Sequence, residues 1–147
     1  MLWQILIGVG VIIATAIIHG FILSLALVHL SPLSRWAVKV ESAARITLAV
    51  SATVIWIMIA HILGVALWAL VFVAVDAIPD ADTAFYFSLV AYTTLGLGDI
   101  LPGENWDILT GLCAANGFLI FGWSTAFQVQ YFDQLNKMRA ELATTES

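Results

Sequence analysis

Long apolar runs without charged side chains dominate this chain. They cover residues 2–30, 46–75 and 108–132. A helix that crosses a bilayer needs about 20 apolar residues, and a charged side chain at its centre costs about 2.5–3.5 kcal/mol. Each run is long enough to cross, and none contains a charge. The pattern therefore predicts an all-α integral membrane protein with three transmembrane helices.

A fourth uncharged stretch, residues 83–98, is too short to cross the membrane. As a helix rising about 1.5 Å per residue it would span roughly 24 Å, against a hydrocarbon core of about 30 Å. It also ends in Gly96-Leu97-Gly98, which disfavours a helix. Non-helical backbone at membrane depth is tolerated only where it is buried in protein or lines a wet cavity. We therefore predict a re-entrant segment, in which a half-helix is followed by an extended return.

The composition supports this interpretation and argues against several other functions. Hydrophobic residues make up 62% of the 147 residues and charged residues 10%, whereas soluble domains have about 25% charged residues. Five Lys and Arg against ten Asp and Glu leave no basic surface for nucleic acid. The single cysteine excludes an intrachain disulfide. We find no nucleophile–base pair, carboxylate dyad or metal-ligand set, so we expect neither an enzyme nor a cofactor.

The distribution of charge predicts the orientation. All basic residues fall in two segments on the same side of the three spans: Arg35, Lys39, Arg45, Lys137 and Arg139. The positive-inside rule makes this side cytoplasmic. The opposite segments carry only carboxylates: Asp76, Asp80, Asp82, Asp99, Glu104 and Asp107. We expect a multi-pass protein of the cell membrane with its N-terminus outside, its C-terminus in the cytoplasm and the re-entrant segment entering from outside. The first three carboxylates are expected to form a solvated acidic loop.

The re-entrant segment carries a recognisable motif. Its run Thr94-Leu95-Gly96-Leu97-Gly98-Asp99 resembles the filter signature Thr-Val-Gly-Tyr-Gly-Asp of the potassium-channel pore family. With the following Pro102-Gly103-Glu104, it looks most like the second pore loop of two-pore-domain potassium channels. The resemblance covers roughly residues 47–132, so the first span lies outside it.

The resemblance implies a division of the chain. The pore domain, residues 46–132, would contain an outer helix over 46–75, a pore helix over 83–93, a filter over 94–99 and an inner helix over 107–132. Before it come an additional transmembrane helix over 1–30, which we expect Pro32 to end, and a basic linker over 31–45. The linker forms either a short interfacial helix or a plain loop, and residues 133–147 form a short cytoplasmic tail. Since one chain supplies one filter loop and a ring needs four, we expect a homotetramer.

The motif suits the chemistry of a dehydrated cation. A potassium ion must exchange its water shell for a ring of oxygens, which backbone carbonyls can supply. Aligning successive carbonyls requires positive φ at alternate residues, which Gly96 and Gly98 tolerate. By resemblance, potassium ions would bind the carbonyls of Thr94, Leu95, Gly96 and Leu97 and the Thr94 hydroxyl. The residues expected to support the filter are Asp99, Thr93, Tyr86, Phe87 and Val90.

Two departures from the family pattern leave alternatives open. Leu97 stands where the family usually has an aromatic residue, so no phenol at this position braces the filter. Val90 stands where some members have a buried glutamate. We therefore expect a passive potassium channel and keep a weakly selective Na⁺/K⁺ channel as the alternative. An ion-coupled transporter is disfavoured because the chain has one broken segment, not a pair. A non-conducting subunit is disfavoured because it needs no paired glycines at membrane depth.

Polar and small residues within the spans are further candidates. Aligned to the family, the inner helix would line a cavity with Leu119, Gly122 and Phe127. Gly117 is either a gating hinge or a packing glycine, and Asn116 either lines the pore or bonds to the half-helix. His19 and His61 lie mid-span, where a histidine pair could act as a proton switch.

Overall fold

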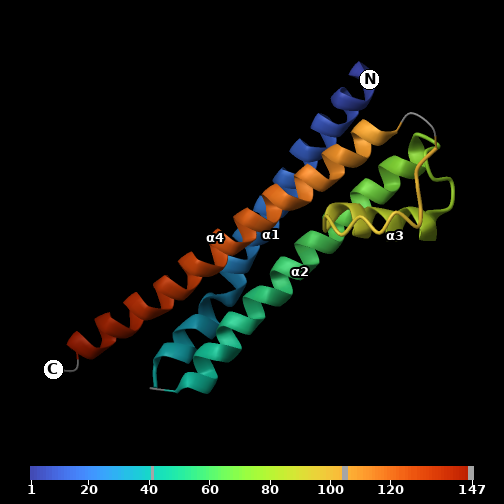
Figure 1. Cartoon of the computed structure of the whole chain (residues 1–147). Helices are drawn as coiled ribbons and strands as arrows, with labels where there is room; N and C mark the ends of the chain where they lie inside the picture. The colour runs from blue at the N-terminus through green and yellow to red at the C-terminus, as the bar shows by residue number, and fades with distance from the viewer. Residues whose placement is uncertain (41, 104–105, 146–147) are drawn as a thin grey trace.

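The computed structural model describes residues 1–40, 42–103 and 106–145 (Figure 1). Its elements are α1 (Leu2–Val38), α2 (Ala43–Ala74), α3 (Ala81–Tyr92) and α4 (Asp107–Thr145). Helices α1, α2 and α4 are long and apolar enough to cross a membrane, so the prediction of three such helices is confirmed. Helix α3 has only 12 residues and lies across α2, on the half of the bundle that carries the N-terminus.

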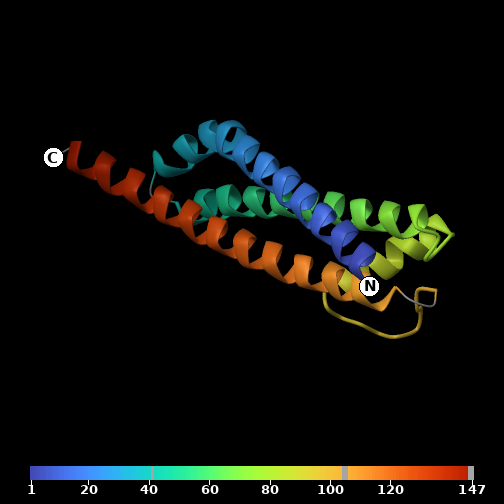
Figure 2. The ribbon, with the colours of Figure 1, turned by 90° about the horizontal axis from the view of Figure 1, so that it is seen from above.

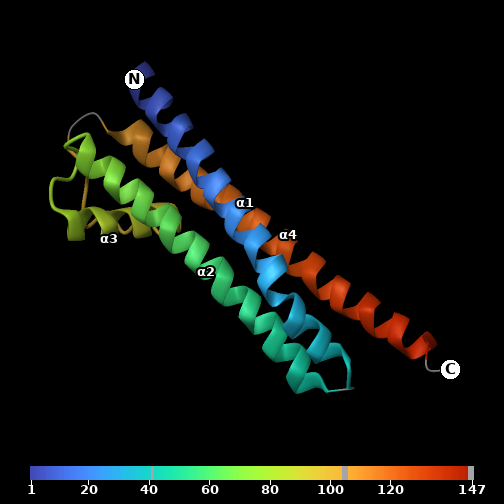
Figure 3. The ribbon, with the colours of Figure 1, turned by 180° about the vertical axis from the view of Figure 1, so that it is seen from behind.

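The long helices pack on one another within the single chain. Helix α1 lies against both α2 and α4, as Figure 3 shows from behind. One apolar cluster, which includes Trp68, Phe72 and Tyr92, joins all four helices near α3. A second cluster around Leu23 and Phe127 joins α1, α2 and α4 further along the bundle. The first helix therefore shares its core with the rest of its own chain.

Helix α1 continues through Pro32, so the prediction that this residue ends the span is wrong. Proline lacks an N–H and cannot donate to the carbonyl four residues earlier, which is that of Val28. The Ser31 hydroxyl donates to that carbonyl instead, at 2.9 Å. The helix bends in this region but does not stop (Figure 2). The hydroxyl explains how the helix tolerates the proline.

The segment between the first two spans is shorter than the predicted linker over 31–45. Helix α1 includes Arg35 in its last turn, and α2 begins at Ala43. The Arg45 guanidinium lies 4.6 Å from the centre of the Trp36 ring, so a cation–π contact links the two helix ends. The basic residues predicted for a separate interfacial helix or loop therefore belong mostly to the ends of the spans.

Helix α4 extends past residue 132, the predicted end of the inner helix, to Thr145. Residues 133–145 are rich in Ala, Leu, Glu, Lys and Arg, which favour helix. Leu135 is 1% exposed and belongs to a third apolar cluster with Ala37 and Ala49 of the other two long helices. The predicted tail is thus largely a continuation of α4.

Helix α3 begins at a capping residue. The Asp80 carboxylate accepts hydrogen bonds from the backbone N–H of Thr83 at 2.8 Å and from its hydroxyl at 2.5 Å. These bonds lower the pKa of Asp80, which is fully exposed. Asp80 is therefore the N-cap of the half-helix. The sequence predicted only that it lies in a solvated acidic loop.

The last residue of α3, Tyr92, is inserted between α2 and α4. It is only 1% exposed. A Cβ added to Gly64 of α2 would lie 3.1 Å from the Tyr92 hydroxyl oxygen, and one added to Gly117 of α4 would overlap the Tyr92 carbonyl oxygen. Both contacts depend on glycine having no side chain. The structure thus gives Gly117 the packing role, which was one of its two interpretations.

This contact predicts that Gly117→Ala destabilises the protein. Alanine should gain about 1 kcal/mol in helix propensity, but the overlap with backbone should make the net loss about 1–3 kcal/mol. Gly10→Ala is the control, because Gly10 also lies in a long helix and a Cβ there meets nothing within 4 Å. Thermal unfolding in detergent should show a lower midpoint for Gly117→Ala and an equal or higher one for Gly10→Ala. Equal midpoints for Gly117→Ala and the parent would contradict the packing.

Candidate functional site

The chain reverses direction sharply after α3. The Thr94 N–H donates to the Ala91 carbonyl at 2.9 Å. The N–H groups of Leu95 and Gly96 both donate to the Val90 carbonyl, at 3.0 and 3.3 Å. These bonds satisfy the end of the helix and send residues 94–101, the return segment, back along α3. The predicted order of half-helix and extended return is therefore present in the chain.

The backbone of the return segment alternates in an unusual way. Thr94, Gly96 and Gly98 have φ of 60°, 58° and 73°, whereas the residues between them have negative φ. In an extended strand successive carbonyls point to opposite sides, and alternation of this kind turns them toward one side. The sequence predicted positive φ at the two glycines. Thr94 was not foreseen, because a β-branched residue is rarely found there.

Strain at Thr94 is informative because the surrounding bonds hold it in place. A non-glycine residue in this region costs of order 1–3 kcal/mol, and such residues cluster at functional sites. The reversal bonds are donated to the Ala91 and Val90 carbonyls by the N–H groups of residues 94–96, so they hold the backbone on both sides of this angle. The chain therefore keeps an unfavourable angle at the residue where the predicted filter begins.

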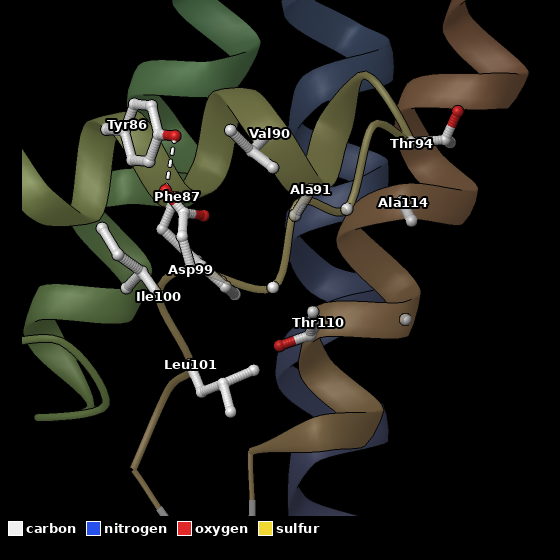
Figure 4. Close-up of a pocket in the computed structure, with 13 residues that line it drawn as sticks. Tyr86, Phe87, Val90, Ala91, Thr94, Asp99, Ile100, Leu101, Thr110 and Ala114 are labelled. Atoms are coloured by element: carbon white, nitrogen blue, oxygen red, sulfur yellow. Dashed lines mark hydrogen bonds between the residues drawn. The ribbon is translucent and has the colours of Figure 1, made fainter.

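The return segment is exposed in the single chain. Leu95 and Leu97 are 61% and 59% exposed, although both side chains are large and apolar. Beside the segment lies a pocket of about 310 Å³ between α3 and α4, lined mainly by apolar side chains such as Val90 and Ala91 (Figure 4). Thr110 of α4 lies on the side of this pocket away from α3.

Tyr86 and Asp99 form a hydrogen bond across the predicted site. The Tyr86 phenol donates to the Asp99 carboxylate at 2.7 Å and so ties the far end of the return segment to α3 (Figure 4). This bond raises the pKa of Tyr86. The sequence named both residues as support without predicting that they meet. Leu97 has no phenol with which to bond to the half-helix. Instead, the phenol of Tyr86 in the half-helix bonds to the carboxylate of Asp99, which follows the predicted filter glycines.

The other expected support residues also lie around the return segment. Phe87 is buried and packs edge-on against Phe72 of α2, with ring centres 5.1 Å apart. Val90 is 8% exposed and lines the pocket. The Thr93 hydroxyl donates to the Leu89 carbonyl at 2.7 Å, so this side chain completes the end of α3.

Two residues assigned to the inner cavity are buried inside the chain instead. Asn116 is 0% exposed and donates to the Thr15 hydroxyl of α1 at 2.8 Å. Both interpretations of Asn116 are therefore wrong, since its partner is neither a cavity nor α3. Phe127 is 9% exposed within the second apolar cluster. The proposed cavity role is wrong for it too, because α1 and α2 cover this side of α4.

The face of α4 turned away from α1 is exposed and contains the other two residues that were predicted to line the inner cavity, Leu119 and Gly122. Leu119 is 63% exposed, and Gly122 is exposed one turn further on. Exposed small residues continue this face at helical spacing: Gly111, Ala115 and Ala126. The structure does not cover this face with any described part of the chain.

Polar contacts between α1 and α4 are features that sequence reasoning missed. Besides the Thr15–Asn116 bond, the backbone N–H of Leu109 donates to the Gln4 side chain at 3.2 Å. Ser34 and Tyr131 share a hydrogen bond of 2.7 Å near the other end. Such contacts link helices in lipid. The residues were visible in the sequence, but nothing in it indicated which helix each one faces.

No protein metal site accompanies these features in residues 1–40, 42–103 and 106–145. No group of three or more His, Cys, Asp or Glu side chains there is placed to hold a metal ion. Ion binding by the site would therefore have to use backbone oxygens and the Thr94 hydroxyl. Glu104, which was assigned to the acidic outer segments, lies outside the described residues.

The Tyr86–Asp99 bond predicts how the return segment responds to mutation. Tyr86→Phe should increase hydrogen exchange of residues 96–101 several-fold, because their tie to α3 is lost. Tyr131→Phe is the control, since it removes a phenol bonded to Ser34 and distant in sequence from this segment. Exchange measured by mass spectrometry in lipid nanodiscs checks this. Unchanged exchange in Tyr86→Phe would show that the bond does not hold the segment.

Comparison with known proteins identifies a family for this region. A family model described as an ion channel matches residues 52–134, more than half of the 147 residues. The match begins in α2, includes α3 and the return segment, and ends in α4. No curated protein and no solved structure matches the chain.

Proposed function

Because the chain belongs to this ion channel family and is a multi-pass membrane protein, we propose that it conducts potassium ions passively through a carbonyl-lined filter formed by four identical chains. The observation that carries the proposal is the alternation of positive φ at Thr94, Gly96 and Gly98. Membership of this family also favours a non-enzymatic role.

The alternation provides the ligands that a dehydrated cation needs. Carbonyls of Thr94, Leu95, Gly96 and Leu97 directed to one side form a column of oxygens, and four columns around an axis enclose successive binding positions. The Thr94 hydroxyl adds an uncharged oxygen at the inner end. Helix α3 ends just before this column, so the negative end of its dipole also favours a cation there.

Exposed apolar surface supports assembly from several copies. Leu95 and Leu97 are more than half exposed, and the described residues of the chain also leave the small-residue face of α4 around Gly111 and Gly122 exposed. Since one chain supplies one return segment, cyclic symmetry with four copies completes the ring. The neighbouring chains would then cover the faces that the single chain leaves open.

The distribution of charge supports one orientation of the protein across the membrane. The basic residues Arg35, Lys39 and Arg45 lie at or near the ends of α1 and α2 that adjoin each other, and Arg139 lies near the end of α4. We place this end in the cytoplasm and the N-terminus outside. The carboxylates near the filter, including Asp99, then face the outside and attract cations to the entrance.

The two selectivity alternatives depend on how firmly the filter is held. The Tyr86–Asp99 bond holds the outer end of the return segment and favours potassium selectivity. Leu97 offers no polar group for a brace of its own, which is the observation that favours a weakly selective Na⁺/K⁺ channel. We rank potassium first because each residue from Thr94 to Leu97 can contribute a backbone carbonyl, so the number of oxygens that favours potassium is unaltered. No feature of the residues that the structure describes favours a transporter or a non-conducting subunit over these two channels.

Currents across planar bilayers test the function directly. Purified protein under asymmetric potassium and sodium should give a reversal potential close to that of potassium. Gly96→Ala should reduce the current, because alanine at φ 58° costs about 1–2 kcal/mol and distorts the carbonyl column. Gly10→Ala is the control, since a Cβ there meets nothing within 4 Å.

The outcomes of this experiment separate the alternatives. A reversal potential that shows no preference between the two cations would establish the weakly selective channel in place of the potassium channel. Absence of current in the parent protein would overturn ion conduction itself. Equal currents in Gly96→Ala and Gly10→Ala would show that the alternating backbone is not the conducting element.

A further inference from the structure

Three long helices meet at a buried hydroxyl group in the middle of the bundle. The Ser124 hydroxyl oxygen of α4 lies 3.0 Å from Nε2 of His19 in α1 and 3.1 Å from Nε2 of His61 in α2. His19 is 2% exposed, and His61 and Ser124 are each 6% exposed. The family match starts at residue 52 and includes only two of them, so His19 adds a contact from outside the matched region.

One arrangement of hydrogens makes all three contacts of the Ser124 hydroxyl into hydrogen bonds. The Ser124 hydroxyl donates to the Ile120 carbonyl at 2.9 Å, because a carbonyl can only accept. In this arrangement both Nε2 atoms carry hydrogens and donate to the serine oxygen. Each neutral imidazole has one N–H, so both Nδ1 atoms are left as bare acceptors. Both Nδ1 atoms are buried, and neither has a hydrogen-bond partner in the described structure.

The surroundings offer no charge that could balance an imidazolium. The sequence contains no Asp, Glu, Lys or Arg over residues 2–34, 46–75 and 108–132. The groups that face the rings are aromatic. Trp123 lies 5.6 Å from His19 between ring centres, and Phe121 and Tyr92 lie 4.4 and 6.0 Å from His61. Among these neighbours from α3 and α4, only the Tyr92 phenol can titrate, and it is neutral when protonated.

From this geometry we propose that His19 and His61 form a proton-binding site that controls how α4 packs against α1 and α2. In the neutral state both rings donate to Ser124 and hold the three helices together. A proton added to either Nδ1 creates a buried cation without an acceptor, 5.2 Å from the other ring between centres. Protonation therefore favours a conformation in which α4 separates from the rings and water reaches them.

The cluster is well placed to affect the proposed filter. Ser124 lies two helical turns beyond Gly117, where α4 contacts the Tyr92 carbonyl. His61 also faces the Tyr92 ring, and the filter begins two residues after Tyr92. A movement of α4 at the cluster would therefore change the contact that positions the filter. Only this last step, from packing to conduction, rests on the proposed function.

Direct observation of the rings and of α4 tests the site independently of transport. With the full chain in lipid nanodiscs, nitrogen NMR of labelled histidine should show His19 and His61 as neutral Nε2–H tautomers at about pH 7.5 and at least one of the two rings protonated after acidification to about pH 4, because burial disfavours the charged ring. Over the same change, hydrogen exchange of residues 118–128 should increase several-fold after correction for the intrinsic rate. Rings that stay neutral would show that the proton site does not exist, and unchanged exchange in α4 would show that protonation does not control its packing. Either result overturns the proposal.

Matched variants assign the response to these two side chains. His19→Gln and His61→Gln keep an N–H₂ donor toward Ser124 but cannot take up a proton in this range, so each should lose the acid response of α4. His29→Gln should keep it, because His29 is exposed on α1 and contacts only the Leu25 carbonyl among the described hydrogen bonds. An acid response that survives in both cluster variants would overturn the proposal, even if the parent titrates.

Potassium flux from liposomes then tests the link to conduction. Between about pH 7.5 and about pH 4, flux through the parent and His29→Gln should change by roughly fivefold or more, and this change should vanish in the two cluster variants. Absence of flux at every pH, with the α4 response intact, would refute the proposed function and leave the proton site standing. Flux that is equally pH-dependent in the parent and the cluster variants would overturn the proton site as a regulator.

Discussion

The insertion of Tyr92 between α2 and α4 is the contact on which the remaining structure depends. Its side chain needs the space at Gly64, and its carbonyl needs the space at Gly117. Together these glycines allow the end of α3 to enter the bundle, where the chain turns back and the return segment starts. The strained angle at Thr94 and the alternation that follows are therefore set from one fixed end. At the other end, Tyr86 holds Asp99, so the short segment is anchored on both sides.

The first helix, although outside the matched region, is integrated with the channel helices. Its side chains reach α4 at intervals, through Thr15, His19 and Ser34. In lipid, a polar group that loses its helix partner finds no water to replace it, so such contacts resist separation. Any displacement of α4 must break or rearrange them. This arrangement makes α1 a support for the helix that carries the exposed face of the proposed pore.

Sequence reasoning was strongest where one local property decides the outcome. Charge-free length determines a span, and glycine permits positive φ, so the spans and the angles at Gly96 and Gly98 could be predicted. It failed where a distant partner decides. Asn116 bonds a residue 101 positions away, and Ser34 of α1 shares a hydrogen bond with Tyr131 of α4, 97 positions away. The positive φ at Thr94 goes against the local preference of a β-branched residue, because the reversal bonds impose it. Backbone strain of this kind is often found at functional sites.

Electron cryomicroscopy of the purified protein in potassium-containing lipid nanodiscs tests the central claim most directly. The account predicts four copies around one axis, with the carbonyls of residues 94–97 directed at ion density on that axis and with Leu95 and Leu97 covered by protein. A particle without a shared axis, or one whose return segments face lipid with their carbonyls turned away from the centre, would contradict it.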